Sequence, residues 1–164
     1  MRTKSYNREN AVAYAHEWAL GRNPQYYDFE HIGGDCTNFA SQVIFAGAGE
    51  MNPSSATGWY YYNLYSRAPA WTGVEFLYRF LMNNQGLGPV AEETDISMAE
   101  PGDIVQLSFD GEAFAHSPVI VSVGNVPSVS NIFVAAHTYD TDYRPLDSYP
   151  YRNLRFLHIT HVNV

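Results

Sequence analysis

The spacing of apolar residues changes part-way along the chain, and this change limits the folds open to it. Near the N-terminus, Ala11, Ala15 and Trp18 recur at intervals of four and three, as on one face of an amphipathic helix. In the second half, residues 118–123 and 132–136 form β-branched runs typical of strands. Helices followed by strands predict an α+β domain with an antiparallel sheet.

Start and stop signals place three helices. The first begins after Asn7, a residue that can cap a helix, and ends at Gly21. The second begins at Cys36 and ends near Gly47, and the third follows a capping box at residues 72–75 and stops before the asparagines at 83–84. The expected strands are residues 104–107, 118–123, 132–136 and 154–164, and residues 51–70 are expected to be irregular.

The length and charge of the chain exclude several classes of function. A chain of 164 residues with 46% hydrophobic content makes one domain, residues 1–164. The net charge of −8 would repel a phosphate backbone, so we expect no nucleic acid partner. No apolar stretch approaches the roughly 18 residues of a membrane span, and the first residues do not form a signal peptide. A single cysteine excludes an internal disulfide.

That cysteine lies in a segment suited to a reactive thiol. Gly33, Gly34 and Asp35 precede Cys36, and Asp35 can cap a helix that begins at Cys36. The positive end of the helix dipole is expected to lower the pKa of the thiol and favour the thiolate. The glycines would let a substrate carbonyl lie against the main chain, so Gly34 and Asp35 are candidate substrate-binding residues. The alternative is a buried structural cysteine.

A cysteine nucleophile needs a general base, and a third polar group to orient that base. His16, His31, His158 and His161 are interpreted as ordinary surface or packing residues. His116 begins one predicted strand and His137 ends the next, with turn residues between them. A hairpin centred between residues 126 and 127 would place the two histidines opposite each other on one face.

Other residues complete the candidate site. Asp140 and Asp142 follow His137 closely, and either could orient the base in its place. Trp59 and Tyr60 belong to an aromatic run that could form the wall of a groove for a peptide or glycan, or pack in the core. No histidine spacing supports a metal site, so no metal or other cofactor is expected.

Several motifs together resemble the bacterial putative amidase domain family, which is related to the NlpC and CHAP cell-wall hydrolases. The motifs occur in the family's order over nearly the whole chain, and they are GGDCTNFASQ at 33–42, WTGVEFL at 71–77, PGDIV at 101–105, His116-Ser117, and HTYD at 137–140 followed by RPL at 144–146. The resemblance implies a papain-like fold, in which a cysteine at a helix N-terminus packs against an antiparallel sheet that carries the histidine.

The resemblance also implies roles for individual residues. Cys36 matches the nucleophile and His116 the base, whereas the orienting position matches His137, with Asp140 as the second choice. Papain-like enzymes carry a glutamine shortly before the nucleophile as oxyanion donor, and Gly33-Gly34-Asp35 stands there instead. The Cys36 N–H is the natural first donor, and Tyr26 or Tyr27 could supply a second.

The implied activity is hydrolysis of amide bonds, with bacterial peptidoglycan as the expected substrate. We expect a monomer that acts outside the cell or at the cell wall, either as an excised domain of an exported protein or as a phage-type lysin. The alternatives are a non-catalytic wall-binding module and a thiol protease or transferase of the same fold. The bond cleaved is left open.

Overall fold

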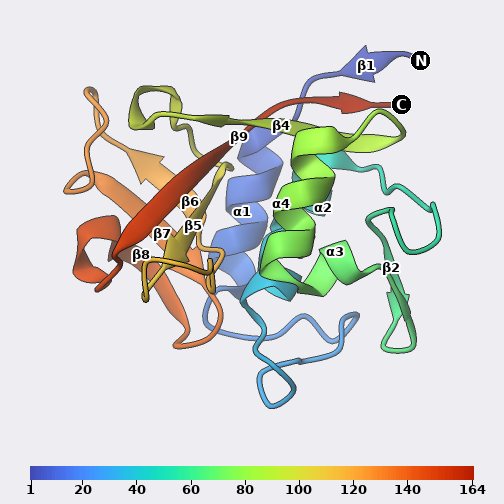
Figure 1. Cartoon of the computed structure of the whole chain (residues 1–164), viewed down its shortest axis with the longest axis horizontal. Helices are drawn as coiled ribbons and strands as arrows, with labels where there is room; N and C mark the ends of the chain where they lie inside the picture. The colour runs from blue at the N-terminus through green and yellow to red at the C-terminus, as the bar shows by residue number, and fades with distance from the viewer.

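The computed structural model describes all 164 residues, and its main body has two layers (Figure 1). Helices lie against a curled antiparallel sheet of seven strands, in the order β1-β9-β5-β6-β7-β8, with β4 paired to β9. The α+β expectation and the antiparallel sheet are therefore confirmed. The helices are α1 (Arg8–Trp18), α2 (Cys36–Ala48), α3 (Pro69–Thr72) and α4 (Val74–Asn83), with 3-10 turns η1 (Ile96–Met98) and η2 (Leu146–Ser148).

Six strands of the large sheet come from the second half of the chain, and the seventh, β1, lies at the N-terminus. They are β1 (Thr3–Lys4), β4 (Gly88–Thr94), β5 (Ile104–Ser108), β6 (Val119–Val123), β7 (Ile132–Ala136), β8 (Thr141–Pro145) and β9 (Asn153–Asn163). A separate small hairpin consists of β2 (Tyr61–Asn63) and β3 (Ser66–Arg67). Because β1 pairs with the end of β9, the two termini lie side by side.

Helices α1 and α2 form as the pattern predicts. The Asn7 side chain caps α1 by accepting a hydrogen bond from the Asn10 N–H. Ala11 and Ala15 are fully buried on the inner face of α1, which packs against α2. No helix combines the length and the apolar character needed to cross a bilayer.

The start of α4 differs from the expectation. The predicted capping box would use Thr72 as the cap, but Thr72 is the last residue of α3 and its hydroxyl accepts from Arg67 Nε at 3.4 Å. Gly73 occupies the cap position of α4 without a side-chain hydrogen bond. Pro69 starts the short helix α3, since proline suits a first helical turn, and this takes Thr72 out of the capping role.

The sheet separates two hydrophobic cores. Residues that alternate along β5, β6 and β7 face opposite sides, so Ile104 and Val119 pack under the helices while Val105 and Ile120 face away. The larger core lies between helices and sheet. The second core is closed by η2 and the residues after it, including Leu146 and Tyr149.

The β6–β7 hairpin forms, but with a different register from the one expected. Val119 pairs with Ala135 and Ile120 with Val134, and a bulge shifts the register by one before Ser122 pairs with Phe133. Continued by two residues beyond Val119, the register sets His137 level with Ser117 and not with His116. The expected pairing of the two histidines is therefore wrong, because a slip of one residue turns a side chain to the other face.

Candidate active site

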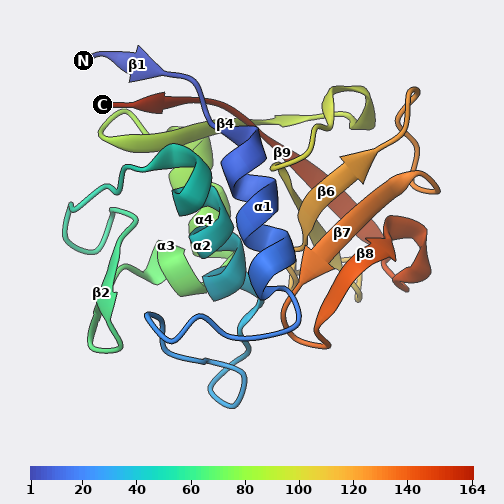
Figure 2. The ribbon, with the colours of Figure 1, turned by 180° about the vertical axis from the view of Figure 1, so that it is seen from behind.

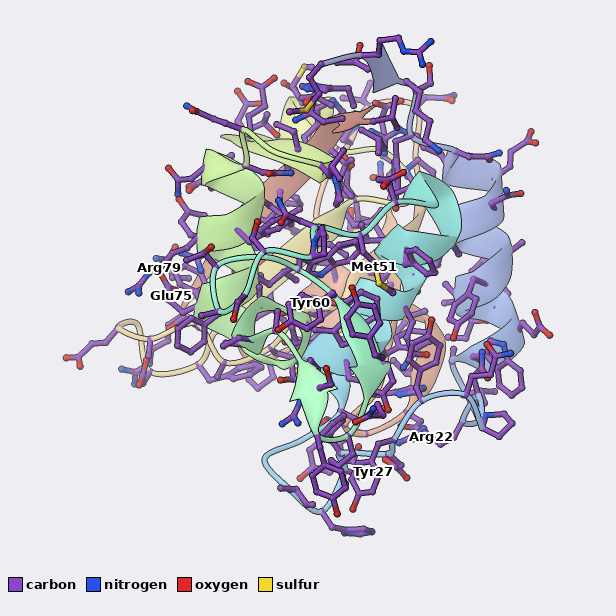
Figure 3. All side chains as sticks on the ribbon, turned by 90° about the vertical axis from the view of Figure 1, so that its right-hand side faces the viewer. Arg22, Tyr27, Met51, Tyr60, Glu75 and Arg79 are labelled. Atoms are coloured by element: carbon purple, nitrogen blue, oxygen red, sulfur yellow. The ribbon has the colours of Figure 1, made fainter.

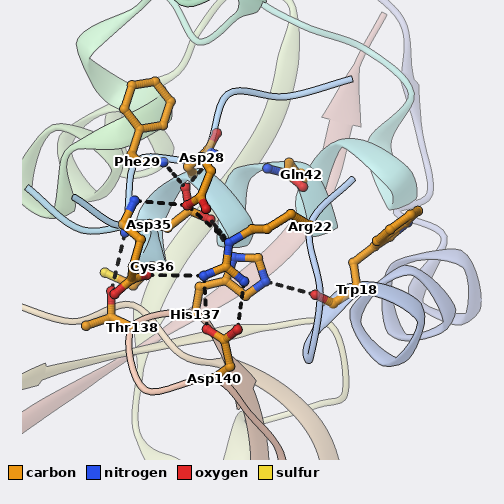
Figure 4. A network of polar contacts seen from close by, with 12 residues as sticks. Trp18, Arg22, Asp28, Phe29, Asp35, Cys36, Gln42, His137, Thr138 and Asp140 are labelled. Atoms are coloured by element: carbon orange, nitrogen blue, oxygen red, sulfur yellow. Dashed lines mark hydrogen bonds and ion pairs between the residues drawn. The ribbon is translucent and has the colours of Figure 1, made fainter. Parts of the chain in front are cut away.

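The only cysteine begins α2, as predicted. Gly33 and Gly34 lead into it with φ angles of +86° and +98°, a conformation that glycine adopts without strain. A Cβ on Gly34 would stand 3.2 Å from Thr138 Oγ1. The Thr138 hydroxyl accepts from the Asp35 N–H at 3.3 Å, so the loop after β7 closes over the residues that precede Cys36 (Figure 4).

Asp35 occupies the cap position of α2, but its side chain does not cap the helix. The carboxylate is fully buried and accepts from the Phe29 N–H at 2.8 Å and from Asn38 Nδ2 at 2.9 Å. Its other oxygen contacts His137 Nδ1 at 2.5 Å. These bonds hold the loop before Cys36 in place, and they leave the Asp35 carboxylate shielded from solvent.

His137 is bound to this carboxylate on the helix side of the sheet. Its Nε2–H donates to the Trp18 carbonyl at 2.8 Å, and its ring stacks on Phe39 with centroids 4.1 Å apart. Both ring nitrogens are therefore engaged, one by Asp35 and one by Trp18 (Figure 4). His137 forms no hydrogen bond with His116, and it joins α1 to the start of α2 instead.

Asp140 is engaged elsewhere too. Its carboxylate accepts two hydrogen bonds from Arg22, at 2.7 and 3.1 Å, in the bidentate geometry that guanidinium favours. Arg22 also pairs with Asp28 and Glu30, so the cluster ties the 22–30 loop to the end of β7. Asp142, the other aspartate near His137, pairs with His16.

His116 lies just before β6, where it bridges to Leu107 of β5. Only 5% of the residue is exposed. Burial, reinforced by the charge of Arg144, lowers the pKa of the imidazole to about 4. His116 is therefore neutral at neutral pH, and a neutral imidazole can accept a proton.

The Cys36 thiol lies against Ser117, the residue that follows this histidine. The Ser117 backbone amide, which directly follows His116, interacts with the sulfur, and the Thr37 and Ser117 hydroxyls lie 3.1 Å apart. Burial nevertheless raises the pKa of the Cys36 thiol, and the hydrogen bonds from Thr37 and Ser117 offset this only in part. The expected lowering by the helix dipole is therefore wrong, because the thiol is removed from water.

The other residues around His116 were not found from the sequence. The Tyr149 ring lies 5.6 Å from the imidazole between centroids, and Phe109 lies at 6.4 Å. The Arg144 guanidinium covers the Tyr149 ring at 3.6 Å. Arg144 lies on β8, Tyr149 follows η2 and Phe109 lies in the loop after β5, and no local motif marks Tyr149 or Phe109. The RPL motif includes Arg144, but it does not indicate which ring the guanidinium covers.

The predicted substrate-binding aromatics divide into two groups. Trp59 is fully buried and donates from Nε1 to Ser41, so its place in a groove wall is wrong and it belongs to the core. Tyr27 is 38% exposed, and Tyr60 is partly exposed and stacks on Tyr62 (Figure 3). Tyr26 packs between Trp71 and Tyr61. None of these tyrosines forms a hydrogen bond with Cys36 or a ring contact with His116.

A surface cavity of about 530 Å³ does not include Cys36. It lies beside α4 and the 52–58 loop and is lined by residues such as Asn52, Phe76 and Asn83. No group of three or more His, Cys, Asp or Glu side chains is arranged to hold a metal ion. The thiol and the imidazole are thus the reactive groups that the fold brings together, away from that cavity.

Comparison with known proteins identifies the family. Residues 5–160 match the family model described as "Putative amidase domain". The chain belongs to this amidase family. It is also 33% identical over 149 residues to the uncharacterized protein YhbB of Bacillus subtilis (strain 168), covering 87% of this chain and 45% of YhbB. The chain thus spans less than half of that relative's length, and no solved structure matches it.

Proposed function

We propose that the chain hydrolyses amide bonds with Cys36 as nucleophile and His116 as general base. The observation that carries the proposal is the position of the Cys36 sulfur at the start of α2, against the backbone amide of Ser117, whose preceding residue is the buried, neutral His116. Membership of the amidase family supports the reaction class. The helix on an antiparallel sheet is compatible with the papain-like fold implied by the motifs, and that fold remains part of this proposal.

The resting site holds a protonated thiol beside a neutral imidazole. When a substrate carbonyl reaches the sulfur, His116 takes the thiol proton as the bond between sulfur and carbon forms. His116 then gives that proton to the leaving nitrogen, and the amine departs as the C–N bond breaks. Water attacks the remaining thioester, gives a proton to His116, and the carboxylic acid leaves as the thiol is restored.

Peptidoglycan is the substrate we propose, and the cell wall is the proposed place of action. The support is the resemblance of the motifs at 33–42, 116–117 and 137–140 to cell-wall hydrolases. YhbB is about twice as long as the matched region, so the whole protein's activity can depend on further parts of such a chain.

The test is release of fragments from purified peptidoglycan, followed by mass spectrometry of the products. The wild-type chain should release fragments that carry the mass of one water, and both Cys36→Ala and His116→Gln should abolish release. His161→Gln is the matched control, because His161 lies on β9 and bonds only to Thr160. Equal release by wild type and Cys36→Ala would eliminate the thiol mechanism.

A second readout separates hydrolysis from binding and transfer. Co-sedimentation with the wall without release by any variant would support a wall-binding module. Products that carry the mass of an acceptor amine would indicate a transferase. Release from a protein substrate but not from peptidoglycan would keep the thiol chemistry and replace the substrate.

A further inference from the structure

The hydroxyl of Tyr149 is a buried polar group without a partner at the edge of the candidate site. The residue is 8% exposed, and Oη has no hydrogen bond in the structure. Its ring packs against the His116 imidazole, with centroids 5.6 Å apart and planes inclined by 56°. A buried donor without a partner is destabilising, because it gives up its bonds to water and receives none in return.

Arg144 holds the ring but does not satisfy the hydroxyl. The Arg144 guanidinium carbon lies over the Tyr149 ring, 3.6 Å from the ring centroid. Arg144 Nε donates a hydrogen bond to Ser148 Oγ at 2.8 Å. The guanidinium comes close enough to the hydroxyl to act on its pKa, but no N–H of Arg144 forms a bond to Oη with hydrogen-bond geometry. The cation–π contact therefore holds the Tyr149 ring in place, while the hydroxyl has no hydrogen-bond partner.

The hydroxyl is also kept protonated. Burial raises the pKa of Tyr149, the charge of Arg144 and the approach of its guanidinium to the hydroxyl oppose this in part, and a charge on Cys36 would add to the rise. The influence of Cys36 places the sulfur within electrostatic reach of this ring. Tyr149 thus keeps a hydrogen-bond donor on a ring that packs against His116.

The candidate site lacks a second donor for that oxygen. The Cys36 N–H, at the first position of α2, has no acceptor within the helix and can serve as one donor. The segment before Cys36 has no glutamine, and the Asp35 side chain is taken up by Phe29, Asn38 and His137. Tyr26 and Tyr27 form no hydrogen bond with Cys36 and no ring contact with His116, since Tyr26 packs against Tyr61 and Trp71 and Tyr27 against Phe29.

We infer that Tyr149 is a catalytic residue whose hydroxyl donates a hydrogen bond to the oxyanion formed when Cys36 attacks the substrate carbonyl. The inference rests on the proposed function, since it assigns a role within the same reaction. The donor makes no bond in the resting site and gains its acceptor only as the carbonyl becomes tetrahedral. Such a contact stabilises the transition state in preference to the ground state.

Two small probes of Cys36 separate this role from others. p-Nitrophenyl acetate acylates a thiol through a tetrahedral oxyanion, releasing p-nitrophenolate. Iodoacetamide alkylates a thiol by displacing iodide from a saturated carbon, without an oxyanion. Cys36 is the only cysteine, so intact mass reports its modification, and Cys36→Ala gives the background from other side chains.

Tyr149→Phe keeps the ring, the contact with His116 and the contact with Arg144, and removes only the hydroxyl. We expect it to slow acylation of Cys36 about 100-fold, the typical effect of losing one oxyanion donor, and to leave alkylation unchanged. Its thermal unfolding midpoint should be equal to or above that of the wild type, because the unpaired hydroxyl is gone. Tyr143→Phe, at a tyrosine that is 57% exposed on β8, is the control and should change neither rate.

The remaining outcomes are decisive. Unchanged acylation in Tyr149→Phe overturns the inference and leaves the proposed function standing. An equal fall in both rates also overturns it, since the hydroxyl would then act on the thiol and imidazole. If neither probe modifies Cys36 in the wild-type chain, the proposed nucleophile is wrong and the role of Tyr149 is wrong with it.

Discussion

At the scale of single residues, the proposed mechanism depends most on the lowered pKa of His116. Its imidazole is buried among Phe109, Tyr149 and the β5 strand, with the positive charge of Arg144 nearby. Both effects disfavour the protonated ring, so its pKa falls from 6.5 to about 4. The acid limb of the pH profile of kcat/KM reports the pKa of the general base in the free enzyme. We therefore expect this limb near pH 4 and not near pH 6.5.

The same shift predicts how stability changes with pH. Between pH 4 and 6.5, the unfolded chain binds a proton at residue 116 and the folded chain does not. The contribution of His116 to the free energy of unfolding is therefore full above pH 6.5. It falls by about 3 kcal/mol as the pH is lowered toward 4. Urea unfolding of wild type and His116→Gln across this range measures it, because the difference in unfolding free energy between them should change by that amount. A constant difference would contradict the lowered pKa.

Residue roles were harder to predict than residue positions. Cys36 and His116 lie where their local signals place them, at the start of a helix and at the head of a strand. Asp35 also lies at the predicted cap position, but its carboxylate bonds to Phe29, Asn38 and His137. Those partners come from distant parts of the chain, and no local pattern reports them. The partner that a buried polar group selects is therefore a property of the tertiary fold.

At the scale of elements, local chemistry was the reliable guide. The Asn7 cap defined α1, and the β-branched run at 132–136 coincides with β7. Strand β4 was missed because its first residues, Gly88 and Pro89, are typical of turns, and β9 supplies the pairing that makes it a strand. The bulge in β6 has no sequence signal either. That bulge decided whether His137 shared a face with His116.

The turn that starts α2 gives a prediction at this scale. Gly34 has φ of +98°, and an added Cβ would stand 3.2 Å from Thr138 Oγ1. Gly34→Ala should therefore destabilise the fold by about 1–3 kcal/mol through backbone strain, and it should disturb the bond from the Asp35 N–H to Thr138. Chemical denaturation measures the cost. Gly21→Ala is the control, because nothing lies within 4 Å of its added Cβ.

A cost at Gly34 no larger than at Gly21 would show that the loop after β7 can move away from the start of α2. In that case the Thr138 contact would not hold the segment before Cys36. A larger cost would agree with the backbone strain expected for alanine at position 34.

At the scale of the whole molecule, the residues of the candidate site are supported by both hydrophobic cores. Cys36 is carried by α2, which belongs to the core beneath the helices. Tyr149 belongs to the second core, on the other face of the sheet, and packs against His116. His116 leads into β6, which lies beside α1 in Figure 2, so the sheet joins a nucleophile on the helix side to a base that contacts the second core.

This arrangement predicts that the two cores differ in their effect on the chemistry. Leu146 is fully buried in the second core, and its carbonyl accepts from the Tyr149 N–H at 3.3 Å. Leu81 is fully buried in the main core on α4. Each leucine-to-alanine change should cost about 2–5 kcal/mol, because both leave a cavity in a packed interior.

The rate of Cys36 acylation should separate the two variants at a temperature where both remain folded. Leu146→Ala loosens the support of Tyr149 and, through it, of His116, so acylation should slow well beyond any loss of folded protein. Leu81→Ala leaves that support intact, and its rate per folded molecule should match the wild type. Near-ultraviolet circular dichroism gives the folded fraction, and p-nitrophenyl acetate gives the rate. Equal rates would mean that the second core does not position the base, whereas a loss in Leu146→Ala alone would show that catalysis depends on the alignment of both cores.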